Sequence, residues 1–242
     1  MLKSRVFDVL RSGYTGSVRC LPVKKRFSML ILLAVLARPI HRLFLKYDPG
    51  QIRKYRLEQG LPLSLIWLLF PLTKLALQPD VLIEPEQLRK LDTLVAQKRG
   101  ALLIGYHSIL MPFLNLSLLD RYTEVVSLGI RKTEFVFGRS FENRIQPEYM
   151  FLKKMLTALD QGKIVAVMAD TEQETKQTTV IATRFGPMRI SLAVFKIALL
   201  KGTPLVFAAP RIRGTKLYFE LEILEQPTDL AETLDHYQHF LA

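Results

Sequence analysis

The sequence is poor in the residues and motifs that mark several large classes of protein. Cys20 is the single cysteine, so an internal disulfide and a multi-cysteine zinc site are excluded, and a reducing compartment is compatible with the chain. Neither glycine-rich phosphate-binding pattern, G-x-x-x-x-G-K-[ST] or G-x-G-x-x-G, occurs. The G-x-S-x-G nucleophile turn is also missing, which argues against a standard α/β-hydrolase. His236 and His239 have no further ligand at metal-binding spacing, so we predict no metal and no cofactor.

The chain also lacks a long uninterrupted apolar run. Residues 27–37 form an uncharged apolar stretch of 11 residues, and residues 61–77 form a second one that Pro62, Pro71 and Lys74 interrupt. A helix that spans a bilayer needs about 20 apolar residues. We therefore expect both runs to lie in the headgroup region or to enter the bilayer only in part. Because Arg38 and Pro39 break the first run and no cleavage site follows, we interpret it as an uncleaved anchor rather than a signal peptide.

The positive charge is unevenly distributed. The formal net charge is +12, and residues 1–60 alone hold 13 Lys/Arg against 3 Asp/Glu. A protein that binds nucleic acid would be expected to carry its basic residues on the folded domain, so we predict no nucleic-acid partner. Basic residues beside apolar segments suit an anionic lipid surface. A basic tail that is merely solvated remains an alternative.

The order of apolar segments predicts two regions. We assign residues 1–82 to a basic, apolar, membrane-associating region and residues 83–242 to an α/β domain. The second region alternates short apolar runs with helical patterns, which is typical of a mostly parallel sheet flanked by helices. The predicted strands are 101–106, 124–128, 163–169, 204–209 and 217–224, with 178–185 as an extended segment or edge strand. The predicted helices are 85–98, 109–119, 147–161, 190–201 and 229–241.

Two polar residues follow predicted strands of that sheet. In parallel sheets, reactive groups lie in loops beyond the carboxyl ends of the strands. His107 comes directly after the strand 101–106, where an imidazole is well placed as a general base. Asp170 ends the strand 163–169 and is a candidate to orient that base or to bind a substrate hydroxyl. The alternatives are a histidine that only ends its strand and a polar loop that caps a turn.

A third candidate site is the turn around Gly186. We expect the Gly186–Pro187 turn to lead directly into the helix 190–201, whose N-terminus would attract anions. Arg184 and Arg189 flank this turn, and arginine can bind phosphate through two parallel hydrogen bonds. Arg131 is a further basic candidate for the same pocket. A surface turn with two solvated arginines is the alternative interpretation.

The order of these features is similar to that of a known family. The segments GALLIGYHS (100–108), KIVAVMAD (163–170) and TRFGPMRISLAVFKIALLKGTPLVFAAPRI (183–212) resemble the lysophospholipid acyltransferase superfamily, and most closely its lipid A late acyltransferases. The resemblance covers roughly residues 25–230. It implies a glycerolipid acyltransferase-like α/β domain preceded by N-terminal membrane-associated helices. The family's motif H-x-x-x-x-D/E is degenerate here, because Pro112 stands where the carboxylate is expected.

What the resemblance implies is a specific reaction. His107 would take the proton of an acceptor hydroxyl, and the hydroxyl would attack an acyl thioester of acyl carrier protein or acyl-CoA. Asp170 would replace the missing carboxylate, and Arg131, Arg184, Gly186 and Arg189 would bind the substrate. The expected acceptor is a lipid or lipid-saccharide hydroxyl, and the expected location is the cytoplasmic face of the inner membrane. The alternative is a non-catalytic relative that binds lipid or assists assembly, with Pro112 as its support.

Overall fold

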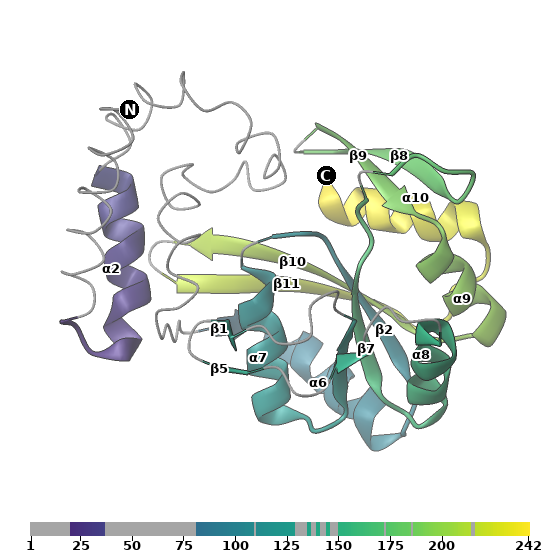
Figure 1. Cartoon of the computed structure of the whole chain (residues 1–242), viewed down its shortest axis with the longest axis horizontal. Helices are drawn as coiled ribbons and strands as arrows, with labels where there is room; N and C mark the ends of the chain where they lie inside the picture. Colours follow the sequence, from purple (N-terminus) through teal and green to yellow (C-terminus); the bar gives the residue numbers. More distant parts are fainter. Residues whose placement is uncertain are drawn as a thin grey trace.

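The fold is described from a computed structural model of the chain (Figure 1). The structure describes residues 20–36, 81–108, 110–128, 135–136, 139–140, 144–145, 150–171, 173–184, 186–213 and 216–242. The second apolar run, residues 61–77, lies outside these ranges, and so does Arg131.

The core of the molecule is a seven-stranded sheet with the strand order β1-β11-β10-β2-β7-β3-β6. All neighbouring strands run parallel except β10 and β11, which form an antiparallel pair. The strands are β1 (Val81–Ile83), β2 (Ala101–Gly105), β3 (Val125–Leu128), β6 (Arg144–Ile145), β7 (Ile164–Met168), β10 (Leu205–Arg213) and β11 (Lys216–Leu224). The predicted α/β fold with a mostly parallel sheet is therefore confirmed.

The two central strands are buried because both of their faces are covered. All five residues of β2 are buried, and β7 pairs with it in register from Ala101↔Ile164 to Gly105↔Met168. Continuous apolar runs of this kind are typical of parallel strands packed between helices. The runs 101–106 and 163–169 were predicted as strands for that reason, and the prediction is confirmed.

Helices cover the two faces of the sheet. One face packs against α2 (Val23–Leu36), α6 (Pro85–Ala96) and α7 (Met111–Arg121), and the other packs against α8 (Phe151–Asp160), α9 (Ala193–Lys201) and α10 (Leu230–Leu241). The helix α9 ends where predicted, at Lys201, and the φ of the next residue, Gly202, is 59°, in the left-handed region that favours glycine. The result is a three-layer arrangement with one apolar core on each side of the sheet.

The first apolar run has a different place from the one predicted for it. It forms α2, in which Phe27, Leu30 and Ile31 are buried in the same core as α7. The rings of Phe27 and Phe113 meet edge to face with centroids 5.5 Å apart. Across the described parts of the chain, no helix combines the length and the apolar composition needed to cross a membrane. The expectation that this run anchors the chain in a membrane is not supported, because its apolar face packs inside the domain.

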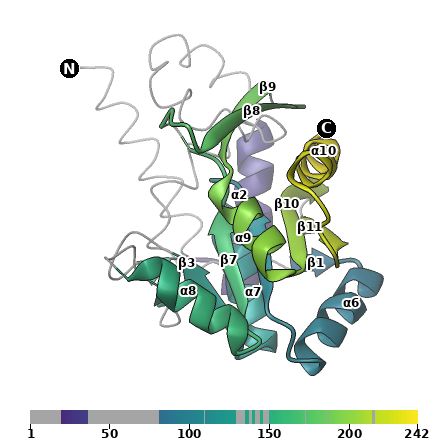
Figure 2. The same ribbon diagram turned by 90° about the vertical axis from the view of Figure 1, so that its right-hand side faces the viewer.

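A β-hairpin replaces the start of a predicted helix. β8 (Thr178–Thr183) and β9 (Gly186–Ser191) pair antiparallel, and α9 begins only at Ala193. The helix predicted from residue 190 was therefore wrong in its first turn. Met188 and Ile190 alternate with more exposed neighbours and are buried, which suits a strand that covers one face of the core. The hairpin lies next to α10 in both views (Figure 1 and Figure 2), where the Ala182 N–H donates to Gln238.

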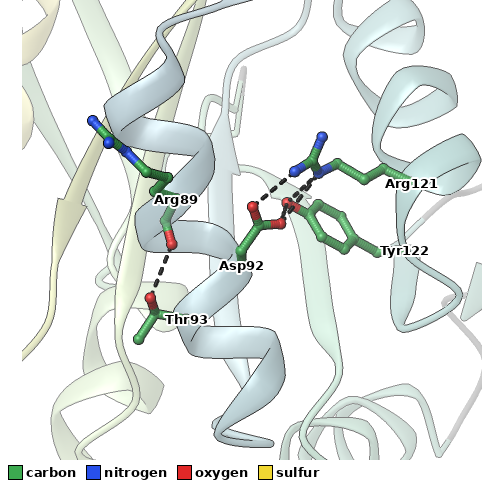
Figure 3. A network of polar contacts seen from close by, with 5 residues as sticks. All are labelled: Arg89, Asp92, Thr93, Arg121 and Tyr122. Carbon is green, nitrogen blue, oxygen red and sulfur yellow. Dashed lines mark hydrogen bonds and ion pairs between the residues drawn. The ribbon is translucent and has the colours of Figure 1, made fainter.

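A polar network joins α6 to the end of α7 (Figure 3). Asp92 Oδ2 accepts from the Arg121 guanidinium at 2.7 Å, and Asp92 Oδ1 accepts from the Tyr122 hydroxyl at 2.7 Å. A second Arg121 nitrogen, Nε, donates to Asp92 Oδ1 at 3.2 Å, so the ion pair is bidentate. These contacts hold the two helices together on one side of the sheet.

Two backbone segments approach closely at the edge of the sheet where β2 and β7 begin. A Cβ atom at Gly100 would lie 2.1 Å from the carbonyl oxygen of Leu159 at the end of α8. The backbone just before β2 therefore packs directly against the end of α8, the helix that leads into β7. Only glycine fits at position 100 without a shift of this backbone.

Candidate functional site

His107 and Asp170 meet because their strands are neighbours. β2 ends at Gly105 and β7 ends at Met168, and the two strands are parallel and in register. Each polar residue stands two positions after the last residue of its strand, so both lie at the carboxyl edge of the sheet. The Ala169 N–H continues the ladder by donating to the Gly105 carbonyl at 2.9 Å. The edge on which reactive groups were expected is the edge where these two side chains lie together.

One carboxylate oxygen of Asp170 holds His107 twice. The His107 backbone N–H donates to Asp170 Oδ1 at 2.7 Å, and His107 Nδ1 lies 3.0 Å from the same oxygen. A neutral imidazole that donates from Nδ1 to a carboxylate carries its basic lone pair on Nε2. The two contacts therefore favour one tautomer and one ring orientation, as the second member of a catalytic triad requires.

The two side chains differ in their access to solvent. The side chain of His107 is 64% exposed and that of Asp170 is 12% exposed. A carboxylate that is mostly shielded from water interacts more strongly with its partner than an exposed one. The exposed imidazole remains within reach of a molecule that approaches from outside. This combination of a sheltered anion and an accessible base suits proton transfer.

The hairpin holds the backbone of Asp170 in an extended conformation. Ser191 N–H donates to the Ala169 carbonyl at 2.7 Å, and Thr171 N–H donates to the Arg189 carbonyl at 3.0 Å. Asp170 itself forms an isolated antiparallel bridge with Ile190. The chain on both sides of the carboxylate is thus fixed by β9, which restricts the positions that the side chain can adopt.

Tyr237 packs in the core next to the end of β2. This side chain of α10 is fully buried, and its hydroxyl points to the Gly105 carbonyl at 3.4 Å. Burial raises the pKa of the Tyr237 hydroxyl well above its usual value, and the charge of Asp170 adds to this increase. The rings of Phe195 and Phe207 pack around it with centroids 5.4 and 5.0 Å away. The sequence predicted a helix over residues 229–241 but carried no signal that Tyr237 lies beside the site.

The turn after His107 leads into α7 without a carboxylate. Ser108 Oγ accepts from the Leu110 N–H at 3.1 Å, and the Ser108 carbonyl accepts from the Met111 N–H at 3.2 Å. Pro112 follows in the first turn of α7, where proline is tolerated because the backbone N–H has no partner within the helix. The position five residues after His107 is therefore used to start a helix. The carboxylate that contacts His107 comes from the neighbouring strand.

The predicted anion pocket at Gly186 has a different geometry. Gly186 has a φ of 100° and begins β9, so the turn joins two strands and does not open a helix. Arg184 lies exposed in that hairpin turn, and its backbone N–H donates to the Leu241 carbonyl at 3.2 Å. Arg189 pairs across the ladder with Val180, and its guanidinium lies 2.9 Å from Glu174. The expectation that the two arginines flank a helix N-terminus is wrong, because α9 begins beyond the hairpin.

The two histidines of α10, His236 and His239, each lie beside a single carboxylate. His236 Nδ1 lies 3.6 Å from Glu222, and His239 Nδ1 lies 3.4 Å from Asp235 on the same helix. Among the residues that the structure describes, no three His, Cys, Asp or Glu side chains gather as metal ligands.

No protein-family model matches the sequence, and no curated protein matches it closely enough to count as a relative. The resemblance to acyltransferases thus rests on the motif residues themselves. What the fold adds to those residues is the contact between His107 and Asp170.

Proposed function

We propose that the protein transfers a fatty acyl group to a hydroxyl, with His107 as the general base and Asp170 as the residue that orients it. The observation that carries this proposal is the 3.0 Å contact between His107 Nδ1 and Asp170 Oδ1 at the carboxyl edge of the sheet. The motif carboxylate expected five residues after the histidine is replaced by Pro112. Asp170, which follows β7, contacts the imidazole and would supply the orientation that a base needs.

The proposed reaction needs no group beyond the two substrates and this pair. His107 Nε2 removes the proton of the acceptor hydroxyl as its oxygen attacks the carbonyl carbon of an acyl thioester. The tetrahedral intermediate then collapses, the carbon–sulfur bond breaks, and the new ester remains on the acceptor. The imidazolium returns its proton to the leaving thiolate. Asp170 stabilises the imidazolium between these two steps without taking up the proton itself.

The proposed substrates follow from charge and from the resemblance. The donor is acyl carrier protein or acyl-CoA, both of which are acidic and suit a chain with a net charge of +12. The acceptor is a lipid or lipid-saccharide hydroxyl at the membrane surface, on the cytoplasmic face of the inner membrane. Because α2 contributes to the core, contact with lipid in this proposal falls to other parts of the chain.

The test is mass spectrometry of membrane lipids from cells that express the full chain, compared with cells that do not. The expected result is a lipid whose mass increases by one acyl chain, and the size of the increase identifies the acyl group. His107→Ala should abolish the new lipid. His239→Ala is the matched control, because His239 also lies beside an aspartate but on the exposed face of α10.

Two outcomes would contradict the proposal. Equal acylation by wild type and His107→Ala would exclude His107 as the base. An unchanged lipid profile with wild-type protein, combined with co-purification of lipid, would favour the non-catalytic lipid-binding alternative. That alternative draws its support from Pro112 in the degenerate motif.

A further inference from the structure

Three consecutive apolar side chains are exposed where α8 begins. Met150 is 41% exposed, Phe151 39% and Leu152 45%. Most other large apolar side chains in the described ranges are buried or half-buried. A single exposed apolar residue is ordinary, whereas adjacent ones mark a surface that contacts something else.

The exposed residues continue the buried stripe of α8. That stripe consists of Met155, Ala158 and Leu159, which pack against the sheet. Residues three and four positions apart lie on one side of a helix, so Phe151 and Leu152 lie above Met155 on the same side. The apolar stripe therefore extends one turn beyond the part of the helix that the core covers.

This uncovered turn lies at the same edge of the sheet as His107. α8 follows β6 and precedes β7, and these strands are parallel members of one sheet. A helix that connects parallel strands begins at the carboxyl edge and ends at the amino edge. The first turn of α8 and the His107–Asp170 pair are thus on one side of the molecule.

A lysine follows the apolar residues directly. Lys153 is exposed and lies in the first turn of α8. Long lysine side chains can extend their charged ends to lipid headgroups while apolar neighbours enter the acyl region. The order of apolar residues and then a cation is complementary to an anionic bilayer in both its hydrophobic and its charged layer.

We propose that Met150, Phe151 and Leu152 insert into an anionic lipid surface, with Lys153 at the headgroups. The insertion brings the carboxyl edge of the sheet, and with it His107, against the membrane. The choice of lipid as the partner rests on the proposed function, but the contact itself requires no catalysis. An acidic protein is a different class of partner for the same surface, and the experiment has to distinguish it from lipid.

The experiment places a fluorescent reporter in the uncovered turn. The exposed Cys20 is replaced by serine, Phe151→Cys is introduced, and the thiol is labelled with the environment-sensitive dye NBD. Leu200→Cys is the matched control, because Leu200 is 87% exposed in the last turn of α9, at the opposite edge of the sheet. Both full-length proteins are titrated with vesicles of phosphatidylcholine that contain about one-third phosphatidylglycerol.

The expected result is a blue shift and an increase in NBD emission at position 151 and no change at position 200. Changing Lys153 to Glu should weaken the response at position 151 by about fivefold or more in lipid concentration. If position 151 responds no more than position 200, the proposal is overturned. It is also overturned if the dye at 151 is already shielded before vesicles are added, because the chain would then cover this turn itself.

Two further measurements distinguish this membrane contact from the proposed acyl transfer and from binding of a protein partner. The same titration in a His107→Ala background should give the same response, so a failure of acyl transfer leaves the membrane contact testable by itself. Addition of acyl carrier protein without vesicles should leave the emission at 151 unchanged. A response to that protein in place of vesicles would assign the surface to a protein partner and overturn the lipid assignment.

Discussion

Asp92 and Asp170 both use their carboxylates to join elements that are distant in the sequence, but they do so with different partners. Asp92 binds the Arg121 guanidinium and the Tyr122 hydroxyl between α6 and α7 (Figure 3). Asp170 binds the backbone and the ring of His107 between two strand ends. The side chain of Asp92 is 41% exposed, whereas that of Asp170 is 12% exposed.

The difference lies in whether the partner can exchange a proton near neutral pH. Hydrogen bonds from Arg121, and then from Tyr122, hold the pKa of the Asp92 carboxyl below its usual value. Burial, followed by the hydrogen bond to Asp92, raises the pKa of Tyr122 to about 12. Every member of that network therefore keeps one protonation state at neutral pH. Asp170 instead contacts an imidazole, a side chain whose ordinary pKa lies near neutral pH, and the proposed function uses this pair for proton transfer.

The largest expected effect separates the two clusters by activity. His107→Ala should lower acyl transfer by about 10²–10⁴-fold, because the general base is lost. Arg121→Ala should leave the transfer rate unchanged, because Arg121 only joins two helices. Rates would be measured as acylated lipid formed per unit of folded protein. Equal losses of transfer activity in both variants would mean that they act through the fold. The two clusters would then not differ in function.

A matched pair of carboxylate variants gives the next largest effect. Asp170→Asn keeps an oxygen that accepts the His107 backbone N–H but removes the charge that stabilises the imidazolium, so transfer should fall by about 10²-fold. Asp92→Asn should change it little. The pH–rate profile of the remaining Asp170→Asn activity distinguishes orientation from folding, since a purely structural loss would leave the profile unchanged.

Stability should show the reverse pattern. Arg121→Ala removes the bidentate ion pair with Asp92, and we expect a small but measurable fall in the free energy of unfolding. His107→Ala should change it by less than about 0.5 kcal/mol, because the side chain is exposed. Urea unfolding followed by circular dichroism measures both. A larger loss for His107→Ala would indicate that the pair at the sheet edge is mainly structural.

The smallest effect concerns alkaline pH. The Tyr122 phenol keeps its proton to about pH 12 in the folded state, whereas the unfolded chain loses it near the usual pKa of about 10. The folded state binds more protons in this interval, so stability declines as pH rises through it. Tyr122→Phe should reduce this decline, which urea midpoints at about pH 9 and about pH 11 would reveal. An identical decline in the variant would mean that other groups cause it.

The parts of the fold that the sequence predicted well depend on local patterns. β2 and β7 are short apolar runs bounded by glycine or polar residues, and the position of His107 and Asp170 at their ends follows from the rule for parallel sheets. Their mutual contact was proposed for the same reason, because neighbouring strands end at one edge. The start of α6 is marked by Pro85, a residue typical of a first helical turn. The end of α9 is marked by Gly202, a residue typical of the position after a helix.

The parts that the sequence did not reveal depend on distant contacts. The last two residues of β9, Ile190 and Ser191, were predicted as the start of a helix because they precede a helical pattern. Pairing with β8 and with residues 169–171 makes them part of a strand. Tyr237 lies in the last helix, and nothing in its neighbourhood indicates that it packs under Gly105. The placement of the 27–37 run inside the core likewise requires α7, which follows much later in the chain.

The burial of α2 has a consequence for synthesis of the chain. Phe27 precedes its ring partner Phe113 by 86 positions. At a translation rate of about 5–20 residues per second, the ribosome needs roughly 4–17 s to deliver that partner. Throughout this delay α7 is not yet available to cover the apolar side of the nascent helix, which carries Phe27, Leu30 and Ile31. Until the ribosome has released α7, that segment therefore exposes apolar side chains of the kind that chaperones bind.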